Sequence, residues 1–375
     1  MKKNVLVLFG GKSVEHDISI ITALQVLKNI DKAVYNVIPI YIERNGVMCT
    51  CENIEETSIY MDFEKRAKKI KYLTFISGKP YIAYRKNGKY SKFQVVDFAL
   101  LCLHGRFGED GALQGILECS HIPYSSCNVR SSALTMDKIF TKDILISRNL
   151  PSLPSAIVLY EDYKSDKEKV IKNVCGKLKF PIILKPSNLG SSIGIKVCRT
   201  REELQEGIEF CAKFDKRILA EKYLEDFVEY NCACVHINNE VKTSQVSMVK
   251  KEGEIFSFED KYLEEKTESG EKVDKGMLLK IKSLTEKVYN AFDCYGVVRV
   301  DFIYDKRAKK LYINELNSIP GSLAFYLFKD LSFKDLITCL IEEGSERLLK
   351  EQYISAYDSE ALEVFEKLDF TKKKK

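Results

Sequence analysis

The sequence has few histidines and lacks the cysteine spacing that builds metal sites in small domains. It contains only four histidines, and none of its twelve cysteines belongs to a C-x-x-C pair. The C-x-C pairs Cys49/Cys51 and Cys232/Cys234 have no matching partner, which argues against a structural zinc site. Because no secretory signal is evident, we expect reduced thiols in a reducing compartment, not a disulfide framework.

The sequence also lacks a long apolar run and a strong charge of one sign. No window approaches the ~18 apolar residues that a membrane-spanning helix needs. The apolar residues 5–9 follow two lysines, as in a signal peptide, but this run is too short and leads directly into Gly10 and Gly11. The net charge of +5 is spread over 375 residues and does not indicate a nucleic-acid surface. We therefore predict a cytoplasmic protein with neither nucleic-acid nor membrane partners.

The first strand-turn-helix unit lacks the two common nucleotide-binding motifs. Residues 5–9 predict a buried strand, and apolar residues recur at helical spacing over residues 15–29. The turn between them is neither a Walker A loop nor G-x-G-x-x-G. It still lies at the carboxyl end of a strand, where open α/β sheets bind ligands. Glu15 at this position is suited to hold a cation.

A second ligand-facing loop is predicted after the strand at residues 95–103. Three glycines surround His104 in the segment HGRFGEDG, which predicts a tight loop with exposed backbone groups. His104 would share a cleft with Glu15; the alternative is a histidine with a purely structural role. Residues 35–42 predict another strand, whereas residues 43–94 show only short strands and charged turns.

A second unit begins near Ser131 and carries groups suited to phosphate. Residues 133–149 have a helical pattern that includes Lys138. Two short strands flank the loop at residues 186–194, PSNLGSSIG. Its backbone N–H groups and hydroxyls can close over phosphate oxygens, with Lys185 beneath as a point charge. A plain surface hairpin is the alternative.

The next segments predict a site between two sheets. The strand at residues 217–223 can supply backbone groups and apolar walls for a nucleotide base. Residues 255–275 form a polar excursion long enough to be a lid. An amphipathic helix at residues 277–292 follows.

Charged side chains in a buried pattern are concentrated at residues 296–321. Apolar residues alternate with Arg299 and Asp301 on one predicted strand, and Glu315 and Asn317 share one face of the next. In an antiparallel hairpin, Asp301 would lie opposite Glu315, and Arg299 opposite Asn317. Two carboxylates and an amide oxygen suit Mg²⁺ shared with substrate phosphates. An edge hairpin with a solvated charged face is the alternative.

Taken together, these motifs resemble the D-alanine:D-alanine ligases of the ATP-grasp superfamily. Five segments occur in the family's order between residues 4 and 327: GGKSVEH at Gly10, HGRFGEDG at His104, KPSNLGSSIG at Lys185, EDKY at Glu259, and RVDF with INELNSIPG from Arg299. The resemblance implies an α/β fold, α+β in parts, with three domains. These would be an N-terminal open parallel α/β domain at residues 1–130, a central ATP-grasp subdomain at 131–222 and a C-terminal domain at 223–375. ATP would lie between the central and C-terminal sheets.

The resemblance implies a reaction in two steps. ATP would phosphorylate the carboxylate of one D-alanine, and the amine of a second substrate would then attack the acyl phosphate, giving a D-,D-dipeptide for peptidoglycan precursors. Two Mg²⁺ ions, replaceable by Mn²⁺, would be bound by Asp301, Glu315 and Asn317. The implied ATP-binding residues are Lys138, Lys185, Ser192, Glu221, Tyr223, Leu224, Glu229 and Lys261. The implied catalytic residues are Glu15, Ser191, Arg299, Gly321 and Tyr262, and the implied substrate-binding residues are His104, Ser322, Tyr326 and Leu327. The family also suggests a homodimer.

The segment after Gly321 departs from the family pattern. Leu323 stands where a threonine is expected, and Tyr326 stands where a serine usually receives the carboxylate of the second substrate. The acceptor is therefore open between D-alanine and another small amino acid such as D-serine, while Tyr262 disfavours a D-lactate ester. Two further hypotheses stay open: an ATP-grasp ligase with a different carboxylate and amine, and a nucleotide-binding protein without turnover. Another departure is one extra residue before Glu229.

Overall fold

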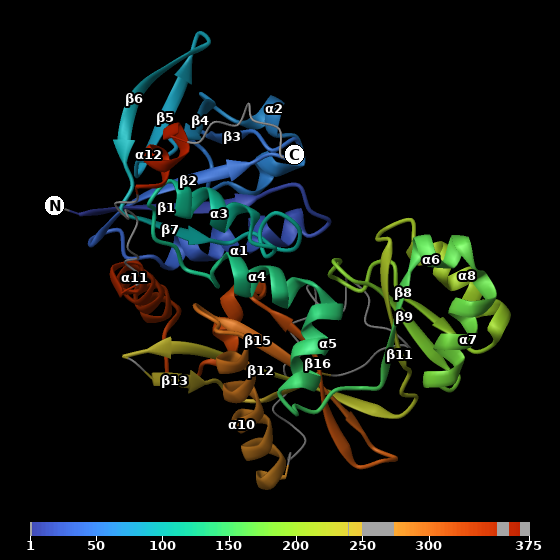
Figure 1. The fold of residues 1–375 in the computed structure, drawn as a ribbon. Coiled ribbons are helices and arrows are strands. Elements are labelled where there is room, and N and C mark those ends of the chain that lie inside the picture. The colour runs from blue at the N-terminus through green and yellow to red at the C-terminus, as the bar shows by residue number, and fades with distance from the viewer. Residues whose placement is uncertain (1, 239, 250–273, 351–359, 368–375) are drawn as a thin grey trace.

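The chain folds around three β-sheets, which Figure 1 shows with helices packed beside them. The computed structural model describes residues 2–238, 240–249, 274–350 and 360–367. The mixed α/β architecture agrees with the predicted fold class. Lys261 and Tyr262, and all but the last two residues of the predicted lid, lie outside the described residues.

The first sheet has seven strands in the order β6-β5-β4-β3-β2-β1-β7. The predicted parallel core consists of β1 (Lys3–Gly10), β2 (Tyr35–Ile42) and β7 (Phe98–Leu101). Residues 5–9 of β1 are fully buried, as expected for a parallel strand covered on both faces. The helices α1 (His16–Asn29) and α3 (Ala112–Cys119) follow β1 and β7.

Residues 43–94 extend this sheet with four antiparallel strands. They form β3 (Met48–Thr50), β4 (Lys71–Phe75), β5 (Tyr81–Lys86) and β6 (Lys89–Val95), with the short helices η1 (Thr57–Met61) and α2 (Phe63–Arg66) between β3 and β4. The first sheet is therefore mixed. The connections between β2 and β3, β4 and β5, and β5 and β6 are short and permit only antiparallel pairing, since a parallel pair needs a long crossover.

Two helices replace the single helix that we predicted at residues 133–149. They are α4 (Val129–Met136) and α5 (Lys138–Ser147). Asp137 between them has an extended backbone, and its carboxylate accepts hydrogen bonds from the N–H groups of Ile139 and Phe140. This is an N-cap, so Asp137 starts a new helix at a point where the apolar periodicity predicts continuation.

The second sheet is antiparallel, in the order β10-β9-β11-β8. Its strands are β8 (Ser155–Leu159), β9 (Ile182–Pro186), β10 (Lys196–Cys198) and β11 (Arg217–Lys222). The helices α6 (Tyr160–Ser165), α7 (Lys167–Lys177) and α8 (Arg201–Cys211) lie beside it (Figure 1). The predicted hairpin around residues 186–194 is present as β9 and β10.

The third sheet carries the predicted central hairpin, β15 (Val298–Asp305) and β16 (Lys310–Asn317). Its order is β13-β12-β15-β16, and β14 also pairs with β12. The remaining strands are β12 (Phe227–Ile237), β13 (Glu240–Thr243) and β14 (Ser247–Val249). The predicted amphipathic helix is α10 (Lys275–Ala291), which buries Ile281 and Val288 against this sheet.

The C-terminal helices are η2 (Gly321–Leu327), α11 (Phe333–Lys350) and α12 (Ala361–Lys367). We expected the tail to pack on the C-terminal domain. α11 does contact β12 of that domain, but it also contacts α1 and β7, and its Leu336 and Ile341 belong to the apolar core of the first sheet. The tail therefore joins the first and third sheets. No helix in the described ranges is long and apolar enough to cross a bilayer.

Candidate active site

The hairpin of β15 and β16 brings the predicted metal ligands together on one face. Asp301 pairs with Glu315 and Arg299 pairs with Asn317, as predicted. Nearer the turn, Phe302 pairs with Ile313, so Asn314 is an extra residue in β16. This irregularity is a β-bulge, a feature often found beside active sites. It brings Asn314 into the wall of the same pocket as Glu315.

Cations hold both carboxylates of this face. The guanidinium of Arg299 donates to the two oxygens of Asp301 at 2.7 and 2.8 Å, and the amide of Asn317 donates to Asp301 at 3.1 Å. The Nζ of Lys138 lies 3.9 Å from Glu315. Among the described residues, no group of three or more His, Cys, Asp or Glu side chains could enclose a metal ion. Two carboxylates and one amide oxygen are ligands of the kind that Mg²⁺ takes when phosphate and water supply the others.

The loop at residues 187–194 is tied to the start of α5. The Nζ of Lys138 donates to the Leu189 carbonyl at 2.7 Å, and the hydroxyl of Ser187 donates to Asp137 at 2.6 Å. Ser191 and Ser192 have φ values of 53° and 57°, the left-handed region that is sparsely populated by residues other than glycine. The loop thus lies against Lys138, with the Leu189 carbonyl directed at its ammonium group.

Lys185 lies at the base of this region in a buried ionic cluster. Its Nζ is 2.7 Å from Oε2 of Glu221 and donates to the amide oxygen of Asn314 at 3.0 Å. The other oxygen of Glu221 is 2.7 Å from the Nζ of Lys142. Burial alone would raise the pKa of Glu221, but the two lysines lower it to about 2. We predicted Glu221 beside the adenine, and the structure places its carboxylate between these lysines.

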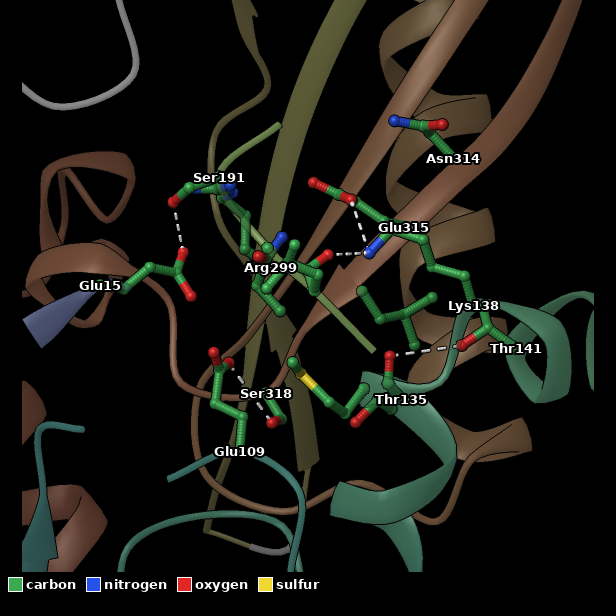
Figure 2. Close-up of a pocket in the computed structure, with 15 residues that line it drawn as sticks. Glu15, Glu109, Thr135, Lys138, Thr141, Ser191, Arg299, Asn314, Glu315 and Ser318 are labelled. Carbon is green, nitrogen blue, oxygen red and sulfur yellow. Dashed lines mark hydrogen bonds and ion pairs between the residues drawn. The ribbon is translucent and has the colours of Figure 1, made fainter. Parts of the chain in front are cut away.

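Glu15 meets the loop from the opposite side of the pocket, as Figure 2 shows. The hydroxyl of Ser191 donates to Oε1 of Glu15 at 2.5 Å. A Cβ atom at Gly190 or Gly105 would come within 2.9 Å of the Glu15 carboxylate. These two glycines therefore leave the space that the carboxylate occupies.

His104 lies next to this carboxylate and connects the first and third sheets. Its Nδ1 is 2.7 Å from the Ile319 carbonyl, so Nδ1 donates. Its Nε2 is 2.9 Å from Oγ1 of Thr22 and accepts the hydroxyl proton, while Oγ1 accepts the N–H of Ser322 at 3.0 Å. Burial lowers the pKa of His104, which favours this neutral tautomer. Both ring nitrogens are thus used to hold the segment around Gly321.

The segment held by Thr22 and His104 has an unusual backbone. Ser322, Leu323 and Ala324 have φ values of 50–52° and ψ values of 23–27°. A left-handed conformation costs roughly 1–2 kcal/mol per residue when Cβ is present. Contacts from the first sheet are therefore needed to keep this turn at the predicted acceptor site.

Glu109, which we did not predict, anchors the same segment. It lines the pocket beside Glu15, and its two oxygens accept the N–H groups of Gly105 and Ile319, each at 2.8 Å. Burial and the nearby charge of Glu15 raise its pKa to about 8. Glu109 thus links the His104 loop to the strand end that carries Gly321.

The other predicted residues that the structure describes lie on or next to β11, β12 and η2. The hydroxyl of Tyr326 is 3.4 Å from Arg299, and Leu327 is buried. Tyr223 and Leu224 directly follow β11 and are buried, while Glu229 lies on β12 opposite Ile303. The structure therefore gathers Glu15, Lys138, Ser191, Arg299 and Glu315 around one pocket (Figure 2).

Two family models match the chain over most of its length. The model described as D-ala D-ala ligase N-terminus matches residues 4–127, and the model described as D-ala D-ala ligase C-terminus matches residues 144–342. The chain belongs to the D-alanine–D-alanine ligase family. Family membership and the three-sheet architecture agree with the predicted ATP-grasp fold and with the resemblance that the motifs suggested.

Curated relatives and solved structures support this family. The chain is 37% identical over 368 residues to a D-alanine–D-alanine ligase of Thermosipho melanesiensis, covering 96% of this chain and 98% of the relative. A Staphylococcus carnosus D-alanine–D-alanine ligase is 34% identical over 94% of this chain and 98% of its own length. The VanG D-Ala:D-Ser ligase from Enterococcus faecalis has a TM-score of 0.79 and 26% identity, over 92% of this chain and all of that one. The Coxiella burnetii D-alanine–D-alanine ligase has the same TM-score at 24% identity, over 97% and 98% of the two chains, and supports the fold alone.

The residues at or beside this D-alanine–D-alanine ligase site that escaped sequence-based prediction include Thr22, Glu109, Lys142 and Asn314. Glu109 lies within the HGRFGEDG motif, where two acidic residues between glycines could have indicated a functional carboxylate. Lys142 follows Lys138 by four residues, which places both on one face of a helix. Thr22 and Asn314 had no such signal, because the roles of both depend on contacts with distant strands.

Proposed function

We propose that this chain is an ATP-dependent D-alanine:D-alanine ligase of the cytoplasm that makes the dipeptide for peptidoglycan precursors. One observation carries the proposal: a single pocket joins Glu15, suited to an ammonium group, with Arg299 and Glu315, suited to a phosphoryl group and its metal. The family and the names of the relatives support the same function.

The nucleotide would lie between the second and third sheets. Lys138 and Lys185 would contact its phosphates, and the loop with Ser191 and Ser192 would cover them, since backbone N–H groups and lysines are common phosphate ligands. Tyr223, Leu224 and Glu229 would face the adenosine. Asp301, Glu315 and Asn317 would hold Mg²⁺, which would neutralise charge on the transferred phosphoryl group.

Amino-acid binding would use the opposite end of the pocket. Glu15 would bind the ammonium group of the first D-alanine, and Ser191 would orient the carboxylate of Glu15. Arg299 and the Gly321 N–H would donate to the oxygen that gains charge when the amine attacks the acyl phosphate. Donors fixed before the reaction stabilise such a charge without reorganisation.

The acceptor has a second candidate, D-serine. Tyr326 places its hydroxyl 3.4 Å from Arg299, where it can donate to an acceptor carboxylate or to an additional hydroxyl. The structural similarity to a D-Ala:D-Ser ligase makes D-serine worth testing. The domains at residues 1–130, 131–222 and 223–375, and a homodimer, are likewise proposals that rest on the family.

The decisive experiment measures ATP-dependent phosphate release with Mg²⁺ and D-alanine alone, with products identified by mass spectrometry. We expect D-alanyl-D-alanine. Release that requires D-serine or another acceptor would reassign the second substrate, and no release with any amino-acid pair would contradict the proposal.

A further inference from the structure

Lys142 is a fully buried lysine for which the proposed mechanism has no direct use. Its side chain is 2% exposed and the side chain of Glu221 is 0% exposed, with 2.7 Å between Nζ and Oε1. Lys142 does not line the pocket of Figure 2. A buried charge is costly unless it is paired, so a lysine at this depth needs an explanation.

The charges of the cluster supply that explanation. Lys185 and Glu221 alone would form a neutral pair, and a neutral pair attracts a phosphate poorly. Lys142 adds one positive charge, so the three side chains together carry +1. Burial lowers the pKa of Lys142, but the carboxylate of Glu221 opposes this shift; at a contact of 2.7 Å we count Lys142 as charged. The pKa of Lys185 is raised by Glu221 in spite of burial.

We propose that Lys142 is a positioning residue of the nucleotide site: it neutralises Glu221, so that the ammonium of Lys185 keeps its positive charge available to the nucleotide phosphates. This inference rests on the proposed use of ATP. It concerns a residue that does not line the pocket and whose ion pair is with Glu221.

The same cluster connects the second sheet with the metal-binding strand. Lys142 donates to the Ile313 carbonyl at 3.3 Å, Lys185 donates to the side chain of Asn314 at 3.0 Å, and Lys138 approaches Glu315. Three lysines thus contact three successive residues of β16. The bulge at Asn314 makes this possible, because successive side chains of a regular strand point to opposite faces.

The test compares Lys142→Met with the double variant Lys142→Met/Glu221→Gln. The single variant lowers the net charge of the cluster from +1 to 0, whereas the double variant returns it to +1 through Lys185. Affinity for ATP with Mg²⁺ is measured by calorimetry, and adenosine, followed by NMR, serves as a probe without phosphate. Lys167→Met, which removes an exposed ion pair with Glu209 on α7, is the matched control.

We expect Lys142→Met to weaken ATP binding about 10-fold or more, with adenosine binding unchanged. The double variant should recover most of the lost ATP affinity, although it contains one more substitution. If Lys142→Met lost equal affinity for ATP and for adenosine, its role would be structural and the inference would be overturned. A double variant that bound ATP more weakly than Lys142→Met would overturn it as well. If the unmodified chain bound no adenine nucleotide, the proposed function itself would fail. Thermal unfolding of each variant identifies loss of the fold.

Discussion

The hydroxyl of Ser191 donates to the carboxylate of Glu15 at 2.5 Å, across 176 positions of the chain. This bond joins the β9–β10 loop of the second sheet to the N-cap residue of α1 in the first. Gly105 and Gly190 approach the same carboxylate from two sides. The position of Glu15, and hence the proposed ammonium site, therefore depends on where the β9–β10 loop lies.

Replacing Ser191 with alanine should weaken D-alanine binding more than ATP binding. The substitution removes the hydrogen bond from Ser191 to a buried carboxylate, a loss of about 1–3 kcal/mol. We expect the D-alanine KM to rise about 5- to 100-fold, with a smaller change in the KM for ATP. Steady-state kinetics at varied D-alanine and varied ATP measure the difference. Ser147→Ala, on the exposed end of α5, is the control, and equal changes in both KM values would refute this role.

Thr22 should control the acceptor half of the site. Thr22→Val keeps the shape of the side chain but removes both the donor to His104 and the acceptor for the Ser322 N–H. Because the left-handed turn is then less well held, we expect a lower kcat and a higher KM for the second amino acid, with the first less affected. Thr22→Ser retains the hydroxyl and should restore activity. A Thr22→Ser variant as impaired as Thr22→Val would show that packing, not hydrogen bonding, matters.

The local patterns of the chain predicted the strands and the pairing of the proposed metal face, which consists of Asp301, Glu315 and Asn317. Alternation with a period of two placed Asp301 opposite Glu315, and the structure agrees. The bulge at Asn314 was not predictable in this way: the register near the turn alone would put Asp301 opposite Asn314. The two registers coexist only because β16 contains one extra residue.

Other features were hidden because they depend on contacts between distant segments. The apolar periodicity of the sequence continues through Asp137, but the helix does not. The Asp137 carboxylate caps α5, so α4 ends at Met136 and a new helix begins. Glu109 accepts an N–H from a residue 210 positions away, and Lys142 pairs with Glu221 on a different element. A pattern within one segment reports which face is buried, but it does not report which buried charges meet.

Glu109 should make stability depend on pH. Its pKa is about 8 in the folded chain, against an ordinary value of 4.5. Between these values the folded state binds a proton that the unfolded state does not, so the free energy of unfolding falls as pH rises, by at most roughly 1.4 kcal/mol per pH unit. Glu109→Gln should flatten this dependence between pH 5 and pH 8 in urea unfolding. The exposed Glu206→Gln should keep the original slope; an unchanged slope in Glu109→Gln would contradict the raised pKa.

Two helical glycines should respond in opposite ways to replacement by alanine. A Cβ at Gly176 of α7 meets nothing within 4 Å, whereas a Cβ at Gly344 of α11 would lie 2.6 Å from the Tyr124 carbonyl. Gly176→Ala should stabilise the chain by about 0.5–1 kcal/mol through helix propensity. Gly344→Ala should destabilise it, because α11 would have to move away from the first sheet. Thermal unfolding of the two variants tests this. Stabilisation by both would mean that α11 packs less closely against the Tyr124 carbonyl than the structure shows.

Asp301 should determine the metal requirement of the reaction. Asp301→Asn keeps the size of the side chain but removes one of the two carboxylates of the metal face and the anionic partner of Arg299. Since even outer-shell changes typically cost 10–100-fold in metal affinity, we expect the Mg²⁺ concentration for half-maximal turnover to rise about 10-fold or more. Asp305→Asn is the matched control.

Asp305 is buried on the same strand but pairs with Lys222 at the turn end of the hairpin. Its replacement should lower stability and leave the Mg²⁺ requirement unchanged. Mg²⁺ titrations of ATP-dependent phosphate release distinguish the two variants. If Asp301→Asn and Asp305→Asn shifted the titration equally, the effect would come from the fold of the hairpin, and the metal face would have to lie elsewhere.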